Sequence, residues 1–150
     1  MTDNQNEGHN GATIDEISGF ATYVLKQRPN VVLLHAGTND MDKNLNVATA
    51  PNRLGALIDK ISEACPDAAI LVAKIIPSRA TATETRIVEY NVAVSSLVGS
   101  RKAAGMKVFL VDQFAALDNS RDLYDSLHPN DGGYSKMATA WYNAIATVAE

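Results

Sequence analysis

The sequence predicts an α/β domain with a parallel sheet. Segments with helical periodicity alternate with short apolar runs along the chain, which is the pattern of parallel strands connected by helices. The first of these runs, residues 31–34, is hydrophobic at successive positions rather than at every second one, as in strands that are buried on both faces. The 150 residues, 46% of them hydrophobic, are enough for one domain and too few for two. We therefore expect a single domain over residues 1–150.

The first half of the chain is predicted to form a helix, a strand and a second helix. Residues 13–27 carry apolar side chains at three- and four-residue spacing, and Thr13 followed by Glu16 has the spacing of an N-terminal capping box. Residues 31–35 (VVLLH) form a strand that we expect to be buried on both faces. Residues 50–64 again show helical spacing.

The second half of the chain repeats this alternation. Residues 68–76 (AAILVAKII) are predicted to form a strand, residues 85–104 a helix and residues 106–111 (MKVFLV) a third strand. Gly105 suits the left-handed conformation that ends many helices. A final helix is expected over residues 131–149. Ligands of such sheets bind beyond the carboxyl ends of the strands, so the segments that follow the strands are the places to look for a site.

Composition excludes several classes of function. Thirteen basic and seventeen acidic side chains give a net charge of −4 with no basic run, so we expect no nucleic-acid or anionic-membrane surface. The apolar stretches are far shorter than the ~20 residues of a membrane span. Cys65 is the only cysteine, which excludes an internal disulfide. His9, His35 and His128 lack metal-ligand spacing, so neither a metal nor another cofactor is expected, and His35 is interpreted as completing a strand end.

The first candidate site segment, Gly37-Thr38-Asn39-Asp40, directly follows a predicted strand. The side chain of Asn39 could direct an N–H group into a cleft as a donor to an oxyanion. Gly37 would allow a sharp turn of the backbone. An ordinary turn is the alternative, because Gly, Asn and Asp favour turns for local reasons.

The second candidate segment is 125–129 (DSLHP), in the loop before the last helix. Asp125 is three residues from His128, so its carboxylate can fold back onto the imidazole and fix its tautomer. The other ring nitrogen is then free to act as a general base. The alternative is a surface loop in which Asp and His only cap a helix.

The third candidate segment, EGHNGAT over residues 7–13, places Gly11 just before the first helix. Backbone N–H groups in such positions attract anions. A flexible N-terminal tail is the alternative for this segment.

Taken in order, EGHNGATIDEI, VVLLHAGTNDM and LHPNDGGYSKMA resemble the SGNH (GDSL) hydrolase family, and in particular its acetylxylan-esterase-like branch of microbial secreted enzymes. The resemblance implies a three-layer, flavodoxin-like fold. It also implies a serine esterase that cleaves short acyl or acetyl esters, above all on carbohydrate. Gly11 and Asn39 would then contribute to the oxyanion hole, His128 would be the base and Asp125 would orient it. A secreted parent is implied, but residues 1–8 (MTDNQNEG) show no signal peptide, so the compartment stays open.

The nucleophile of this family is missing from the sequence. The serine of a Gly-Asp-Ser block is the family's nucleophile, and no such block occurs in the 150 residues. We therefore expect a domain without its first strand and crossover helix, and a chain that is nearly inactive by itself. In a strand order of 2-1-3-4-5 the missing strand is central, so the strand at 31–35 would have an unpaired edge open to self-association.

Two alternatives remain. One is a pseudoenzyme that binds saccharide or acyl ligands without turnover, and the other is an interaction module that pairs through its open sheet edge. Tyr134, Trp141 and Tyr142 are interpreted as core or helix-face residues rather than as a platform for sugar stacking.

Overall fold

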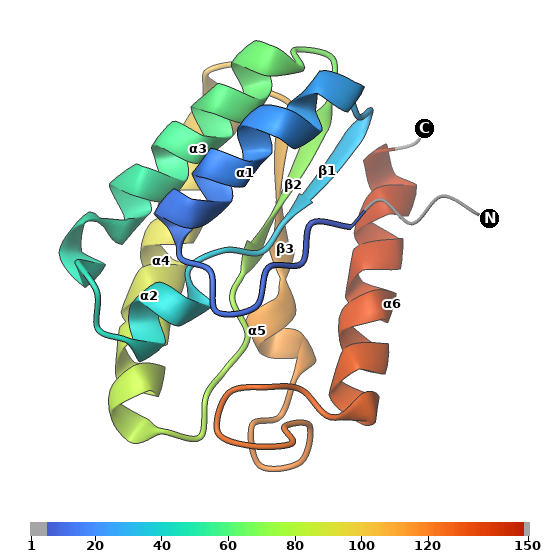
Figure 1. The fold of residues 1–150 in the computed structure, drawn as a ribbon. Coiled ribbons are helices and arrows are strands. Elements are labelled where there is room, and N and C mark those ends of the chain that lie inside the picture. Colours follow the sequence, from blue (N-terminus) through green and yellow to red (C-terminus); the bar gives the residue numbers. More distant parts are fainter. Residues whose placement is uncertain (1–5, 149–150) are drawn as a thin grey trace.

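The computed structural model describes residues 6–148 and contains a parallel sheet with helices on both of its faces (Figure 1). The predicted α/β fold is confirmed. In chain order the elements are α1 (Ile14–Val24), η1 (Leu25–Gln27), β1 (Val31–Leu34), α2 (Thr38–Asp42), η2 (Val47–Thr49), α3 (Ala50–Ala64), β2 (Ala69–Lys74), α4 (Thr81–Ala103), β3 (Val108–Asp112), α5 (Gln113–Ala116) and α6 (Asp131–Val148).

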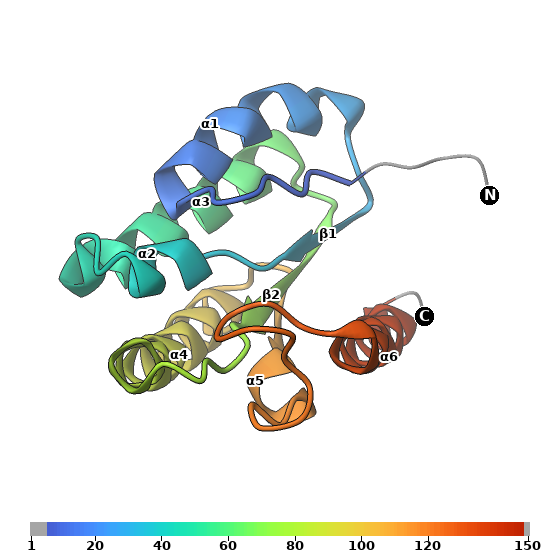
Figure 2. The same cartoon turned by 60° about the horizontal axis from the view of Figure 1, so that its bottom comes forward.

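The sheet has the order β1-β2-β3, with all described strand pairs parallel. Leu33 of β1 pairs with Leu71 of β2, which in turn pairs with Phe109 of β3. Figures 1 and 2 show α1, α3 and α4 on one side of the sheet and α6 on the other. All three strands therefore end at the same edge, and the segments that follow them meet there.

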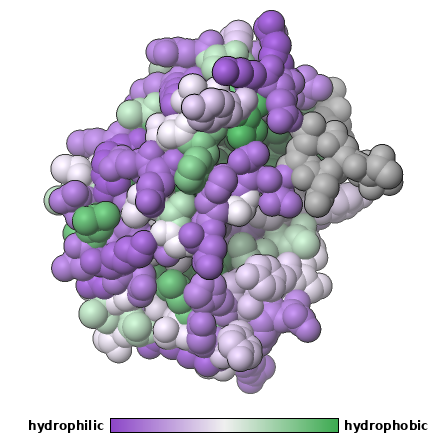
Figure 3. All heavy atoms as spheres, viewed as in Figure 1, coloured by the Kyte–Doolittle hydropathy of each residue, from purple (hydrophilic) through white to green (hydrophobic). Residues whose placement is uncertain are grey.

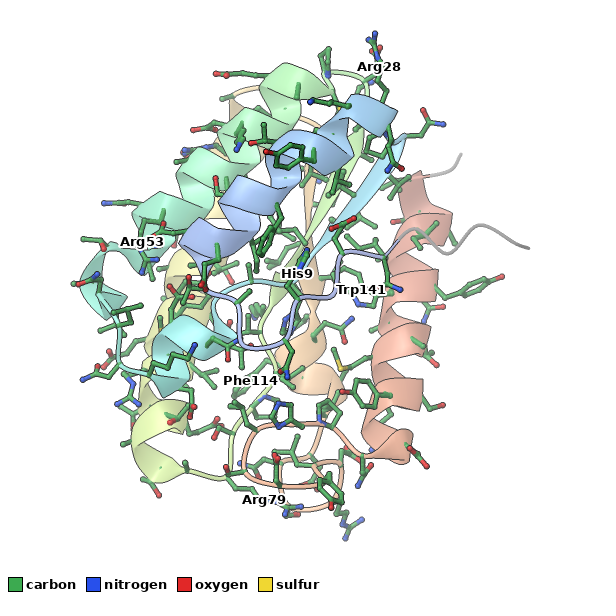
Figure 4. All side chains as sticks on the ribbon, viewed as in Figure 1. His9, Arg28, Arg53, Arg79, Phe114 and Trp141 are labelled. Atoms are coloured by element: carbon green, nitrogen blue, oxygen red, sulfur yellow. The ribbon has the colours of Figure 1, made fainter. Side chains whose placement is uncertain are left out.

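The main core lies between the sheet and the three helices α1, α3 and α4. Its fully buried side chains include Leu54, Ile58, Ile70, Ile87 and Val94. On the opposite face, α6 packs on β2 and β3, and Figure 4 shows Trp141 projecting from α6 toward the sheet. Three of the helices that the periodic spacing of apolar residues predicted, α1, α3 and α4, thus cover one face of the sheet.

Strand β1 differs from the sequence expectation. Leu33 is 42% exposed, so β1 is not buried on both faces. Within residues 6–148, β1 pairs with β2 alone and is an edge strand, which confirms the expectation of an unpaired edge. Because α6 packs on β2 and β3, it leaves this face of β1 partly open.

Several element boundaries also differ. Helix α4 begins at Thr81 instead of residue 85, because its first turn is polar and gives no periodic signal. Strand β3 begins at Val108, two residues later than expected, whereas Gly105 has the left-handed conformation that the sequence predicted. The short helices α2 and α5 were not predicted. Residue 149, the expected end of the last helix, lies outside the described residues.

Figure 3 shows that hydrophilic side chains cover most of this face of the molecule, with apolar side chains exposed in separate areas. No helix within residues 6–148 is long and apolar enough to cross a membrane.

Candidate active site

Asn39 is positioned by a sharp turn at the carboxyl end of β1. Gly37 has φ = +119°, and a Cβ there would lie 2.7 Å from the ring of Tyr90. The Tyr90 hydroxyl donates to the Ala36 carbonyl at 2.9 Å, and this hydrogen bond fixes the residue that precedes Gly37. The chain then enters α2, a short helix that carries Asn39 in its first turn. Only glycine fits this combination of φ angle and close approach.

Asn39 of α2 and Lys43, which directly follows this helix, both bind the segment that contains Gly11. The Asn39 side-chain amide donates to the Ala12 carbonyl at 2.9 Å, and the Lys43 ammonium donates to the Gly11 carbonyl at 2.7 Å. Gly11 has φ = +73°. Its N–H has no hydrogen-bond acceptor within the described part of the chain. One N–H of the Asn39 amide and the N–H of Gly11 are thus free to bind a ligand.

A buried ion pair that sequence reasoning missed holds the same segment. The Asp40 side chain is 0% exposed and accepts from Arg53 Nη1 at 2.7 Å. Its other oxygen accepts from the N–H of Ile14 at 3.0 Å. Arg53 also donates to the carbonyls of Leu45 and Asn46. Asp40 stood in the motif beside Asn39, but nothing in the sequence connected it with Arg53.

The start of α1 has the predicted capping box. The N–H of Glu16 donates to the Thr13 hydroxyl, and the N–H of Thr13 donates to the Glu16 carboxylate at 2.8 Å. These contacts lower the pKa of Glu16, with the backbone hydrogen bond from Thr13 as the largest cause. The helix therefore begins at a fixed point three residues after Gly11.

The structure also brings Asp125 and His128 together. One oxygen of Asp125 lies 2.8 Å from His128 Nδ1, and the other accepts from the N–H groups of Leu127 and His128, each at 2.7 Å. The hydrogen bonds from the backbone of His128 and Leu127, followed by that from the imidazole, lower the pKa of Asp125 to about 2. An ionised Asp125 makes Nδ1 the donor and leaves Nε2 of His128 as the nitrogen that can accept a proton.

The loop around His128 is tied to the rest of the domain by its backbone. The His128 carbonyl accepts from the N–H of Tyr124 at 2.7 Å, and the Ser126 carbonyl accepts from the Ser78 hydroxyl at 2.8 Å. Asn130 caps α6 by accepting from the N–H of Gly133 at 2.9 Å. The imidazole is therefore held by a hydrogen-bonded loop although 59% of its surface is exposed.

A cavity of about 370 Å³ joins these groups at the carboxyl end of the sheet. Gly11, Asn39 and His128 all line it, while Asp125 supports His128 from outside the lining. No serine or cysteine is among the lining residues in the part of the chain that the structure describes. The Thr38 hydroxyl oxygen is buried there without a hydrogen-bond partner.

His35 and Tyr134 also lie in the cavity lining. His35 follows the last residue of β1, accepts from the N–H of Ile76 at 3.4 Å, and has its pKa lowered by burial to about 4. Tyr134, expected in the core or on a helix face, lies on α6, lines the cavity and is 55% exposed. Tyr142 is 73% exposed on the same helix and does not belong to the core. Within residues 6–148 no group of three or more His, Cys, Asp or Glu side chains could hold a metal ion.

A carboxylate-oriented histidine and amide donors beside the carboxyl ends of parallel strands are typical of α/β hydrolases that cleave esters. Comparison with known proteins agrees. The chain belongs to the GDSL-like Lipase/Acylhydrolase family, which matches residues 2–136. It is 27% identical over 162 aligned residues to a multidomain esterase of Ruminococcus flavefaciens, an alignment that covers 95% of this chain and 21% of that relative.

Solved structures share the fold. The family 3 carbohydrate esterase of Clostridium thermocellum has a TM-score of 0.82 and 32% identity, over 95% of this chain and 69% of its own. A serine-to-alanine mutant of an acetyl esterase, solved with an acetate ion, has a TM-score of 0.85 at 24% identity, over 97% of this chain and 72% of its own. The expected family is confirmed, and its neighbours include carbohydrate esterases.

Proposed function

We propose that this chain carries the base and part of the oxyanion hole of a serine esterase for short acyl esters, above all acetyl esters of carbohydrate. The observation that carries the proposal is the meeting of Gly11, Asn39 and His128 in one cavity, with Asp125 bonded to His128 Nδ1. Membership of an acylhydrolase family and likeness to a carbohydrate esterase support the ester and the saccharide parts of the proposal.

Each residue has a defined task in this chemistry. His128 Nε2 takes the proton of a serine hydroxyl as that oxygen attacks the ester carbonyl, and later gives it to the leaving alcohol. Asp125 holds the imidazole in the required tautomer and stabilises its cationic form. The N–H of Gly11 and the free amide N–H of Asn39 donate to the carbonyl oxygen as it becomes negative. Water then releases the acyl group from the serine.

We further propose that the 150-residue chain alone has almost no turnover. It contains no Gly-Asp-Ser block, and loss of the serine of a triad reduces kcat about 10⁶-fold in a measured protease. The test is hydrolysis of a short-chain aryl acetate by the purified chain. Turnover that disappears in His128→Ala would contradict this proposal. Sequencing the coding region upstream of Met1 would show whether an in-frame segment supplies the serine.

Ligand binding without turnover is the second candidate function. The free N–H of Gly11 and the amide of Asn39 favour it, because these donors are in place without the serine of a Gly-Asp-Ser block. A structural neighbour that lacks its serine was solved with acetate, which makes acetate a suitable probe. Saturable acetate binding that is lost in Asn39→Ala, with no hydrolysis of esters, would favour this candidate. An immediate upstream stop codon would favour it further.

Self-association through β1 is the third candidate. The edge of β1 that faces away from β2 has no strand partner within residues 6–148, and Leu33 beside it is 42% exposed. Unpaired edges of this kind bind other strands. We expect a dimer or larger assembly by light scattering. Leu33→Pro should weaken it, because the parallel register directs the N–H of Leu33 to the open edge and that of Val32 to β2. A monomer at all concentrations would contradict this candidate.

A further inference from the structure

Tyr134 occupies an unusual position for an exposed aromatic residue. It lies in the first turn of α6 and lines the same cavity as Gly11 and His128, with 55% of its surface accessible. It is the only Phe, Tyr or Trp among the lining residues in the described part of the chain. Its ring is therefore available to a ligand in the cavity, whereas an aromatic residue of the core is not.

The position of Tyr134 relative to His128 is fixed by the backbone. The N–H of Tyr134 donates to the Asn130 carbonyl at 2.9 Å. A Cβ at the preceding Gly133 would lie only 2.3 Å from the Asp122 carbonyl oxygen, so the start of α6 is pressed against the loop before it. The Asp122 carbonyl also accepts from the N–H of Asn130 at 2.9 Å. The backbone that carries Tyr134 is thus fixed against the loop that carries His128, and both side chains line the cavity.

A second carboxylate–imidazole pair lines the cavity. Glu7 Oε2 lies 2.9 Å from His9 Nε2, and the His9 ring stacks on Phe20 with a centroid distance of 3.8 Å. Figure 4 shows His9 on the segment that leads into α1. Both Glu7 and His9 are lining residues, and His9 Nδ1 has no hydrogen-bond partner within residues 6–148. The proposed ester chemistry uses neither side chain.

We propose that Tyr134 and the Glu7–His9 pair form a saccharide subsite in this cavity. The ring of Tyr134 stacks on the C–H face of a sugar, and the Glu7–His9 pair hydrogen-bonds to its hydroxyl groups. The inference rests on the proposed esterase function, since it places the alcohol part of the ester beside the groups that hold its carbonyl.

The chemistry of the lining favours a sugar over a lipid alcohol. Sugar hydroxyls are both donors and acceptors and so match a carboxylate and an imidazole nitrogen. An aliphatic chain in the same place would cover Glu7 and His9 without satisfying their hydrogen bonds, which costs free energy. A cavity with one aromatic face and a few convergent polar groups is typical of small-molecule sites.

The test is a titration of the 150-residue protein with xylotriose and, separately, with acetate, followed by amide chemical shifts. We expect Tyr134→Ala to weaken xylotriose binding roughly tenfold, Tyr134→Phe to retain it, and His9→Ala to weaken it about fivefold. Acetate binding should stay unchanged in all three. Tyr142→Ala is the matched control, because it changes the same residue type on the same helix, 73% exposed and outside the cavity lining.

The outcomes separate this inference from the proposed function. No xylotriose binding by the wild-type protein, or equal binding by Tyr134→Ala, overturns the subsite, and retained acetate binding then leaves the esterase proposal intact. Loss of binding in Tyr142→Ala equal to that in Tyr134→Ala also overturns it. Failure of the wild-type protein to bind acetate counts against the proposed function itself. Tyr134→Leu, which keeps apolar bulk on α6, gives the same answer should Tyr134→Ala not fold.

Discussion

Replacement of Asp40 by Ala should destabilise the domain strongly, because it breaks a buried ion pair from one side. The change leaves the guanidinium of Arg53, only 18% exposed, with the weaker partner Asp15, whose 67% exposed carboxylate lies 3.4 Å from Nη1. It also leaves the N–H of Ile14 without its acceptor. Removing one partner of a buried pair costs about 3–5 kcal/mol. Arg53 keeps its contacts with the carbonyls of Leu45 and Asn46, so we expect about 3 kcal/mol. For a chain of this length that corresponds to a decrease in Tm of about 6–12 °C.

The assay is urea and thermal unfolding followed by circular dichroism, with Asp59→Ala as the control. Asp59 also binds an arginine, Arg101, with two hydrogen bonds of 2.9 Å, but its side chain is 43% exposed. The control should therefore cost less than about 1 kcal/mol. Equal losses in the two variants would refute the reasoning.

A double variant tests the cause. Asp40→Leu combined with Arg53→Met removes both charges and replaces them with apolar groups, so it should be more stable than either single variant. If the double variant loses the sum of the two single losses, the pair is not coupled. Acetate binding by Asp40→Ala, measured where the variant is still folded, should be weaker than in Asp59→Ala, because the segment after Gly11 loses its anchor at Ile14.

Three further predictions concern backbone strain and pH. Gly37→Ala should lower the free energy of unfolding, measured in urea, by several kcal/mol more than Gly105→Ala does. The Cβ at position 37 would lie 2.7 Å from the ring of Tyr90, whereas the Cβ at position 105 would meet no atom within 4 Å. Similar losses in the two variants would be inconsistent with this close approach. The Asp125 carboxylate should titrate near pH 2 when followed by NMR. Its contribution to stability is then fully present above the usual Asp pKa of 3.8 and is lost as the pH falls through 2. A titration midpoint at 3.8 would contradict the hydrogen bonds of this loop. Burial lowers the pKa of His35 from 6.5 to about 4, so between these pH values the imidazole is protonated in the unfolded chain and neutral in the folded one. The free energy of unfolding should therefore decrease as the pH falls from 6.5 towards 4. This decrease should be smaller in His35→Gln, and an unchanged pH profile of stability would speak against the prediction.

The helices of the core could be predicted from the sequence because their apolar residues repeat at helical spacing. Helix α3 has the predicted bounds, and α1 with η1 fills the predicted segment. The first turn of α4 could not be predicted, since it is polar and is held by contacts with distant residues such as that of Thr83 with Asp42. The exposure of β1 could not be predicted either, because a run of apolar residues does not tell which faces are covered.

The candidate site, like the fold, could be predicted from the sequence only in part. Local motifs were enough to indicate Gly11, Asn39 and the pair Asp125–His128. The contacts that position them join residues far apart in the sequence, as Lys43 does with Gly11, and no periodic pattern reveals such pairs. Tyr134 lies on a helix face, as one of the two expectations had it, but helical spacing does not show that this face borders a cavity.

The two halves of the candidate site are held independently of each other, and this bears on what the chain can do without the serine of a Gly-Asp-Ser block. The proposed oxyanion donors depend on contacts of residues 39–43 and Arg53 with residues 11–14, all within the first 53 residues. The proposed base depends on hydrogen bonds of the loop before α6, with Ser78 as its link to the segment after β2. Neither set of contacts requires a nucleophile. Binding of a carboxylate or an ester should therefore survive where turnover does not, so affinity for acetate is the better first measurement on this chain than a rate of hydrolysis.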